Sequence, residues 1–298
     1  MIINQDSIAL AFKGFQTKFT DAFVATEVDW PKIAMEVPSQ ASDESYGWFA
    51  QFPNMREWVG ARVVKNLSAR GFNIKNKLFE STISVARTDF EDDRLGIFGP
   101  LLSEMGGNAK RHPESIIFGL LKTGFSSPSF DGQNFFDLLH PVMGEDGVTV
   151  TNVANTDGGA GTPWFLLDTS RAIRPIIWQT RMPYEFQAKT ANFDENVFLN
   201  DEYLYGVRAR ANAGFGLWQL AWGSKQTLNP ANYAAARAAM SAFKADGGKI
   251  LGIKPNLLVV PPSLEQQARD LLMAPTGAAG ASNSWYQSAD LVVTPYLI

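Results

Sequence analysis

The sequence predicts a mixed α+β fold, and three observations carry that prediction. A long helical pattern lies at residues 94–122, where apolar side chains recur at helical spacing. Strand-like apolar runs separated by turn signals lie before and after it. Residues 125–161 are rich in Ser, Gly, Asn and Asp, which is typical of loops. No internal repeat is found, so the order is an arm, a hairpin, a long helix and a mixed body.

We interpret residues 1–45 as an N-terminal arm. Four phenylalanines at helical spacing predict an amphipathic helix over 5–24: Phe12, Phe15, Phe19 and Phe23. The steps Trp30-Pro31 and Val37-Pro38 favour extended chain, because the residue before a proline avoids the helical region. Residues 39–45 are polar and are interpreted as a hinge. The arm has little to bury by itself, so we expect it to become ordered against a partner surface.

Residues 46–90 are predicted to form a long hairpin with flanking strands. The paired strands are expected at 58–67 and 72–85, with Gly71 supplying a positive φ between them. The apolar positions change parity at Leu78-Phe79, so a bulge or bend is expected there. An isolated two-stranded ribbon is marginal in water, and this one is locally basic. It is therefore expected to lie on an acidic surface, with a solvated charged face as the alternative.

Residues 91–124 are predicted to be mainly one long helix that follows an acidic run. Acids near a helix start interact favourably with the helix dipole, so we expect them to cap this helix. A calcium loop is rejected, because Arg94 stands where such a loop needs glycine and Pro100 where it needs glutamate. Pro113 is expected to begin a second stretch of the helix, with His112 as its cap, and Gly124 to end it.

Residues 125–298 are expected to alternate between strands and helices, after a loop region with one hairpin. Strands are predicted at the apolar runs 164–167, 176–178, 203–205, 215–218, 257–260 and 291–293. Asn229 is predicted to cap a helix from Pro230 to Asp246. A capping box at 263–266 is predicted to open a second helix that runs through Met273. His140 is interpreted as a turn residue before Pro141.

The composition excludes several classes of function. The 298 residues include no cysteine, which removes disulfides, thiolate nucleophiles and iron–sulfur clusters. Only two histidines are present, and neither lies in a metal or hydrolase motif. The net charge is −4 with no basic tail, which is unlike nucleic-acid binders, and no apolar run is long enough for a membrane span. Phosphate-loop, dinucleotide and nucleophile-elbow motifs are missing, so the sequence predicts no enzyme, no metal and no cofactor.

Five motifs occur in one order along nearly the whole chain. They are Tyr46-Gly-Trp48 with Phe52-Pro53; Arg56-Glu-Trp-Val-Gly60; Phe79-Glu80 followed by Asp89-Phe-Glu-Asp-Asp93-Arg-Leu-Gly96; Phe130-Asp-Gly-Gln-Asn-Phe-Phe-Asp137 with His140-Pro141; and Asp246-Gly-Gly248 before Lys254-Pro255. Together they resemble the major capsid proteins, or major head subunits, of Mu-like phages and prophages.

The resemblance implies a Hong Kong 97-type phage capsid fold without catalytic residues. Residues 1–45 would be the N-terminal arm, 46–90 the extended loop, 91–124 the spine helix of the peripheral domain, and 125–298 the axial domain with the rest of the peripheral domain. The implied function is a structural subunit of an icosahedral head that encloses double-stranded DNA. An encapsulin-like compartment that holds cargo protein is the alternative with a similar fold. An enzyme with an unrecognised site is the third hypothesis.

The implied partners are many copies of the same chain, as hexamers and pentamers, with a scaffold protein, a maturation protease, a portal and a decoration protein. The protein would reside in the virion, and in the host cytoplasm before assembly, with no membrane contact. Packaged DNA would be contacted weakly and without sequence preference, because the net charge is −4 and the chain has no basic tail.

The charges also predict a contact between copies. Basic residues of the hairpin in one copy are expected to meet the acidic run of a neighbour. The basic set is Arg62, Lys65, Arg70, Lys75 and Lys77, and the acidic set is Asp89, Glu91, Asp92 and Asp93. Such pairs would mainly determine register and the choice of partner.

Overall fold

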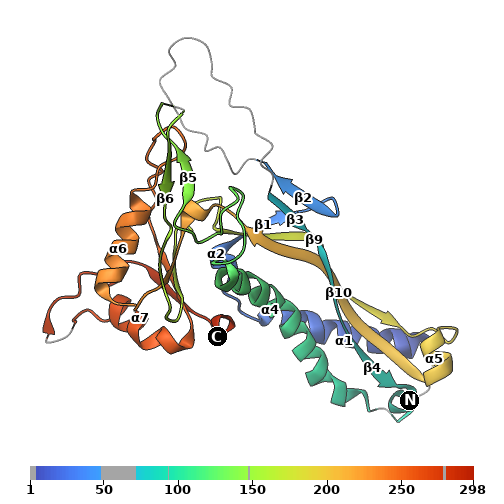
Figure 1. The fold of residues 1–298 in the computed structure, drawn as a ribbon. Helices are drawn as coiled ribbons and strands as arrows, with labels where there is room; N and C mark the ends of the chain where they lie inside the picture. Colours follow the sequence, from blue (N-terminus) through green and yellow to red (C-terminus); the bar gives the residue numbers. More distant parts are fainter. Residues whose placement is uncertain (1–4, 48–71, 93, 147, 278–279) are drawn as a thin grey trace.

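The computed structural model describes residues 5–47, 72–92, 94–146, 148–277 and 280–298. The described residues form an elongated region and a compact region, and α4 (Gly99–Thr123) runs from the first into the second. Figure 1 shows the N-terminal end of the chain at the far tip of the elongated region, whereas the C-terminus lies beside the compact region. No helix among the described residues is both long and apolar enough to cross a bilayer.

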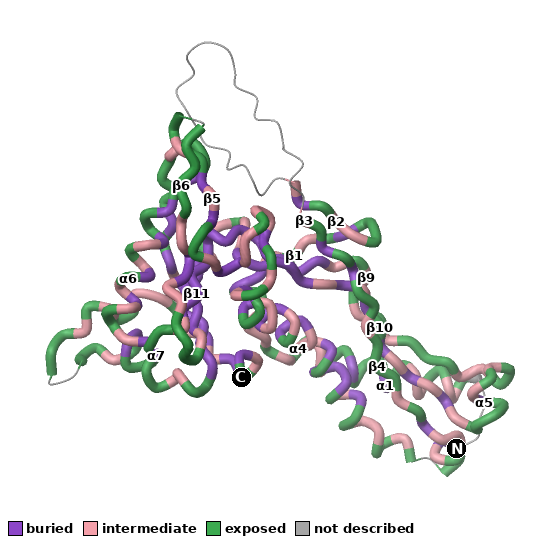
Figure 2. Tube along the Cα trace, in the orientation of Figure 1, coloured by how far each residue is buried: buried purple, intermediate pink, exposed green. Residues whose placement is uncertain are grey.

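The elongated region is built on a four-stranded sheet in the order β1-β9-β10-β4. Its strands are β1 (Ala34–Pro38), β9 (Ile176–Lys189), β10 (Glu202–Phe215) and β4 (Lys77–Ala86). β10 is antiparallel to both of its neighbours, and β1 is parallel to β9. Side chains alternate along β10, so that Tyr203, Tyr205 and Val207 are buried on one face. Figure 2 shows this alternation along the middle of the sheet.

Two helices, α1 (Gln5–Ala25) and α4, cover the buried face of this sheet. The predicted phenylalanine stripe of α1 packs inside its own chain: Phe15 contacts Tyr205 edge-on at 5.0 Å and Phe19 stacks on Phe186 at 5.1 Å between ring centroids. A side chain at Gly106 of α4 would clash with the backbone carbonyl of Phe19, so glycine permits this close approach. The helix prediction is confirmed. The expectation that the stripe needs a surface outside the chain is wrong, because α4 and β9 provide it.

The segment after α1 differs from the prediction. Residues at the Trp30-Pro31 step form a short helix, α2 (Trp30–Ile33), rather than extended chain. The buried carboxylate of Glu114 accepts hydrogen bonds from the N–H groups of Asp29, at 2.5 Å, and Trp30, at 3.3 Å, which holds this helix start against α4. Val37-Pro38 is extended in β1, as predicted.

The predicted hinge and hairpin also take a different form. Instead of a hinge, the polar segment leads into β2 (Asp43–Tyr46), which pairs antiparallel with β3 (Phe72–Lys75). The predicted second strand is divided at Asn76: β3 pairs with β2, whereas β4 pairs with β10 without a bulge. The bend therefore lies before Leu78-Phe79, because the Asn76 side chain turns inward and is buried. The predicted first strand, 58–67, lies outside the described residues.

The acidic run belongs to a separate short helix, α3 (Arg87–Glu91), and a 3-10 turn, η1 (Leu95–Phe98), precedes α4. The first turn of α4 holds no acid, so the prediction that the acids cap the long helix is wrong. α4 continues through Pro113, and His112 lies inside the helix rather than at a cap. Gly124 ends the helix, as predicted.

The compact region surrounds a five-stranded sheet in the order β13-β12-β8-β11-β7. Its strands are β7 (Thr156–Gly159), β8 (Trp164–Leu167), β11 (Ala221–Lys225), β12 (Leu257–Val260) and β13 (Asp290–Val293). Every residue of β8 and β12 is buried, which explains their unbroken apolar runs. The strand predictions at 164–167, 257–260 and 291–293 are confirmed.

Two helices and a hairpin complete the compact region (Figure 1). The hairpin pairs β5 (His140–Met143) with β6 (Val150–Val153), as expected for one hairpin in this loop region. α6 (Pro230–Ser241) is capped by Asn229 as predicted, but it ends early because residues 242–250 fold into a turn with positive φ at Gly247 and Gly248. α7 (Glu265–Leu272) begins after a 3-10 turn, and no side chain caps it, so the capping-box prediction is wrong.

Candidate functional site: the charged ends of the elongated region

The part of the chain that the structure describes contains no group of three or more metal-binding side chains. Both histidines serve structural contacts instead. A 2.6 Å hydrogen bond joins Nδ1 of His112 to the Tyr184 hydroxyl, and the imidazole ring packs edge-on against Phe79. Burial lowers the pKa of His112 and raises the pKa of Tyr184, which favours the neutral form of each. A cavity of about 260 Å³ lies beside them, between α4 and β4.

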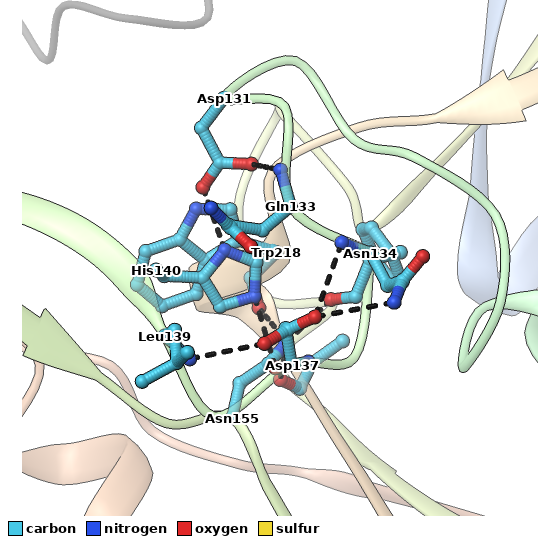
Figure 3. A network of polar contacts seen from close by, with 10 residues as sticks. Asp131, Gln133, Asn134, Asp137, Leu139, His140, Asn155 and Trp218 are labelled. Atoms are coloured by element: carbon cyan, nitrogen blue, oxygen red, sulfur yellow. Dashed lines mark hydrogen bonds and ion pairs between the residues drawn. The ribbon is translucent and has the colours of Figure 1, made fainter.

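His140 lies at the centre of a buried polar network, so its interpretation as a turn residue is wrong (Figure 3). Its Nδ1 lies 2.6 Å from the carboxylate of Asp131, and its Nε2 lies 3.1 Å from Oδ1 of Asn155. The ring stacks on Trp218, with centroids 4.0 Å apart. Both ring nitrogens therefore face acceptors, and the histidine is fully enclosed.

Asn155 connects this network to the compact region. Its Nδ2 donates to the carbonyl of Phe135 at 2.8 Å, and its Oδ1 accepts from the N–H of Asp137 at 2.9 Å. Asp137 in turn accepts from the N–H of Leu139 at 3.1 Å. The network thus fixes the loop 130–137, one of the motifs behind the family resemblance, against β5 and β11. Its central members, His140 and Asn155, are fully buried, so the network holds these segments together.

The surface features that remain are charges and exposed apolar groups. Of the predicted basic set, Lys75 ends β3 and Lys77 begins β4, and both are exposed. Arg62, Lys65 and Arg70 lie outside the described residues. The two described lysines of the predicted set therefore lie at one end of β4.

The acids lie at the other end of β4. Asp89 and Glu91 are in α3 and Asp92 follows it, whereas Asp93 lies outside the described residues. Two of these acids already face cations in their own chain: Glu91 lies 3.7 Å from Arg87, and Asp92 lies 3.8 Å from Arg94. The acidic side chains of these pairs remain more than half exposed, at 55% and 60%. The acidic end is therefore partly neutralised and still open to water.

The two charged ends cannot meet within one chain. β4 is ten residues long, which corresponds to about 30 Å at roughly 3.3 Å per residue. Its antiparallel pairing with β10 is continuous from Lys77 to Ala86, so the strand is extended over its whole length. The acids follow directly after Ala86, so the described lysines and the acids are separated by the length of the strand. A contact between them requires two copies.

The sequence reasoning missed an apolar group at the same end as the acids. Phe193, Phe198 and Leu199 have exposed fractions of 90%, 81% and 65%, and they lie on or beside α5 (Glu195–Asn200), which connects β9 to β10. Three large apolar side chains are thus left in water on one short polar connection, which makes this connection a candidate contact surface. That signal was readable in the sequence, where Phe193 and Phe198 stand among Asp, Glu and Asn.

The fold defines the class, which is a Hong Kong 97-type phage capsid subunit. A chain of the procapsid of bacteriophage JBD30 superimposes with a TM-score of 0.89 at 44% identity, covering 99% of this chain and all of that one. A chain of the bacteriophage JBD30 capsid gives 0.77 at 33% identity, with full coverage of both chains. The similarity is therefore greater to the procapsid subunit.

The chain belongs to the family of Mu-like prophage major head subunits, gpT, whose model matches residues 8–297. It is 41% identical over 305 aligned positions to the major capsid protein of Escherichia phage Mu, with full coverage of both. It is 38% identical to the Mu-like prophage FluMu major head subunit of Haemophilus influenzae, with 99% coverage of both. The chain is thus a major capsid subunit that forms the icosahedral head of a Mu-like phage, and the family is one of structural virion proteins. The encapsulin-like alternative gains no support over this function.

Proposed function

We propose that the opposite ends of β4 meet between neighbouring copies in the head. The basic end of one copy, with Lys75, Lys77 and the hairpin residues Arg62, Lys65 and Arg70, would face the acidic end of the next. The observation that carries the proposal is the separation of the described charges along β4. The described lysines of the predicted set lie at one end of the strand and its described acids at the other, although Arg87 and Arg94 also lie at the acidic end and Asp43 lies beside Lys75. In an assembly of identical copies, such an arrangement favours contact between unlike ends.

The energies of such contacts are small individually. Exposed ion pairs contribute about 0–1 kcal/mol each, and the acids must exchange part of their contact with Arg87 and Arg94. The contact repeats for every copy, so its effect accumulates over the shell. Its main effect is on register and partner choice, and it weakens as salt screens the charges.

We propose further that copies assemble as hexamers and pentamers and that the head encloses double-stranded DNA. The net charge of −4 supports weak, non-specific contact with that DNA, since phosphate binding scales with the number of Lys and Arg residues that neutralise it. A scaffold protein, a maturation protease and a portal would act with the subunit in the host cytoplasm. In bacteriophage JBD30 the capsid is decorated with trimers of a minor capsid protein, and we propose a comparable decoration here.

Charge reversal tests the contact between copies. The triple variant Lys65→Glu, Lys75→Glu and Lys77→Glu should fold normally but form few shells, most clearly at low salt, where repulsion between acidic ends is unscreened. A matched control, Lys244→Glu with Lys254→Glu, reverses two exposed lysines of the compact region and should assemble normally. Shell yield is measured by sedimentation and negative-stain microscopy.

Rescue makes the test specific. Adding Asp92→Lys and Asp93→Lys to the triple variant should restore part of the shell yield, because both ends then carry the opposite sign. Normal shell yield from the triple variant at low salt would contradict the charge contact.

Binding of the free subunit to duplex DNA below micromolar concentration at physiological salt would contradict the proposed weak DNA contact.

A further inference from the structure

The short ladder formed by β2 and β3 is where the chain leaves the body and returns to it. Tyr46 pairs directly with Phe72, and the pairing continues to Asp43 with Lys75. The 25 residues between Tyr46 and Phe72, which include Arg62, Lys65 and Arg70, therefore leave from one rung and return to it. Figure 1 shows β2 and β3 beside β1, at the end of the sheet away from the N-terminus.

A buried amide of the sheet holds this ladder. Gln179 of β9 is fully enclosed, and its Nε2 donates to the carbonyl of Ile74 at 3.0 Å and to Oδ1 of Asn76 at 2.8 Å. Its Oε1 accepts a 2.8 Å hydrogen bond from the Tyr46 hydroxyl. Burial raises the pKa of Tyr46 to about 12, so this hydroxyl keeps its proton and donates. One side chain thus contacts both strands of the ladder and the bend that follows it.

Asn76 extends the network to the segment before β2. Its Nδ2 donates to Oγ of Ser39 at 2.9 Å and to the carbonyl of Ala41 at 2.9 Å. Its own N–H donates to the carbonyl of Ser42 at 2.9 Å, and the N–H of Ser39 donates to the carbonyl of Thr180 at 2.9 Å. The segment is therefore tied to β9 at Thr180 and, through Asn76, at Gln179.

Apolar packing seats the ladder on the same strands but does not fix its angle. Ile74 is buried over Gly214 of β10, where any side chain would overlap it. Apolar contact is non-directional, so it permits a range of tilts. Hydrogen bonds between buried amides are directional, and a buried amide left without its partner destabilises the folded chain. A tilt of the ladder would break several of them together.

We infer that Gln179 is a positioning residue for assembly, because its amide fixes the angle at which the β2–β3 ladder leaves the sheet. The inference rests on the proposed contact between the basic segment and a neighbour. It adds to that contact a residue that sets the direction of the β2–β3 ladder relative to the sheet. Asn76 and Tyr46 act through Gln179 in the same way. Subunits that lack the Gln179 amide should therefore fold but join their neighbours at variable angles.

The test compares shells of Gln179→Ala with those of a matched control. Asn256→Ala removes an amide that bonds Thr169 beside the compact sheet, far from the ladder. Both variants should lower the melting temperature of the subunit. Only Gln179→Ala should broaden the distribution of shell diameters and produce open or misclosed particles in negative stain. Its ladder amides, at 43–46 and 72–75, should also exchange hydrogen at least tenfold faster, with β8 and β12 unchanged.

Tyr46→Phe supplies a milder second variant, since it removes one hydroxyl and keeps the ring. It should broaden the shell diameters less than Gln179→Ala, and it decides the matter if Gln179→Ala fails to fold. Uniform shells of wild-type diameter from Tyr46→Phe and from any folded Gln179→Ala would overturn the inference. Broadened diameters from Asn256→Ala as well would also overturn it, because loss of stability alone would then explain the effect. If the Lys-to-Glu variants assemble as well as the wild-type protein, the proposed charge contact is wrong, whatever the Gln179 and Tyr46 variants show.

Discussion

The two regions bury their strands in different ways. In the compact region β8 and β12 are buried at every position, whereas along β10 of the elongated region buried and accessible residues alternate. The compact region also joins one large core that includes the end of α4, through Ile117, Phe118 and Leu121. That core also takes in the near part of the elongated region, at Ile176–Trp178 of β9 and Phe215 of β10. The outer part of the elongated region depends on two small clusters, which include Phe15 and Phe19 of α1.

This difference indicates a division of roles. A region with one large core is stable through its own contacts, since burial of apolar surface is the dominant favourable term in folding. A region held by two thin clusters leaves strands, charges and apolar groups exposed, which suits contact with neighbours. The comparison therefore predicts that core substitutions unfold the compact region, whereas substitutions in the elongated region loosen it locally or alter assembly.

The largest effect is expected from Phe165→Ala in β8. Phe165 is fully buried and contacts Phe125 and Phe136. Truncation of a buried phenylalanine costs about 3–5 kcal/mol through lost burial and a residual cavity. Urea unfolding of the free subunit measures the loss. A change below about 1 kcal/mol would mean that the large core is not the source of stability.

A smaller, local effect is expected from Gly106→Ala in α4. The added methyl group clashes with the carbonyl of Phe19, so α1 must shift, at a cost of about 1–3 kcal/mol for overpacking. Gly119→Ala is the matched control in the same helix, because nothing lies within 4 Å of its added methyl group. The control should be neutral or stabilising by up to about 1 kcal/mol, since alanine favours helix. Hydrogen exchange should accelerate over α1 in the first variant only; equal exchange in both would contradict close packing.

A pH-dependent effect is expected at Glu114, where the elongated region meets α2. Burial raises the pKa of Glu114, and hydrogen bonds from the N–H groups of Asp29 and Trp30 offset part of that rise. The folded chain then binds the proton more tightly than the unfolded chain. Stability from this group therefore falls as pH rises from its ordinary pKa through the raised one.

Glu114→Gln removes this titration and keeps an oxygen acceptor for both N–H groups. The free energy of unfolding of the variant, relative to wild type, should therefore increase with pH across that window. Urea titrations at several pH values above 4 check the direction. A relative stability that is constant with pH, or that decreases, would show that burial does not control this carboxyl.

The smallest effect on stability is expected from Phe198→Ser with Leu199→Ser in α5. Both side chains are largely exposed, so the free energy of unfolding should change by no more than about 0.5 kcal/mol. Shell yield should fall nonetheless, because the apolar group would no longer be buried against a neighbour. Unchanged shell yield would indicate that these residues stay in water in the head.

The sequence predicts best where structure is local. The stripe of α1, the strands β8 and β12 and the cap at Asn229 follow from spacing, apolar runs and a known cap pattern. The helix at Trp30-Pro31 could not be predicted, because its start is held by Glu114, which is 84 residues away. Local rules for proline do not include such a partner.

The same limit applies to the polar networks. Figure 3 shows that His140 is enclosed by Asp131, Asn155 and Trp218, which come from separate segments without any periodic signal. Gln179 and Asn76 are 103 residues apart, so nothing in either neighbourhood indicates their contact. The contact between copies stays a prediction: Lys75, Lys77, Glu91 and Asp92 are exposed, and their separation along β4 emerged only from the sheet register.

Hydrogen exchange before and after shell formation tests the division between the regions most directly. The account predicts that protection gained on assembly concentrates in the elongated region, at the β2–β3 ladder, α3 and α5. The core strands β8 and β12 should be protected already in the free subunit and should gain little. Equal gains in both regions, or gains confined to the compact region, would contradict the account.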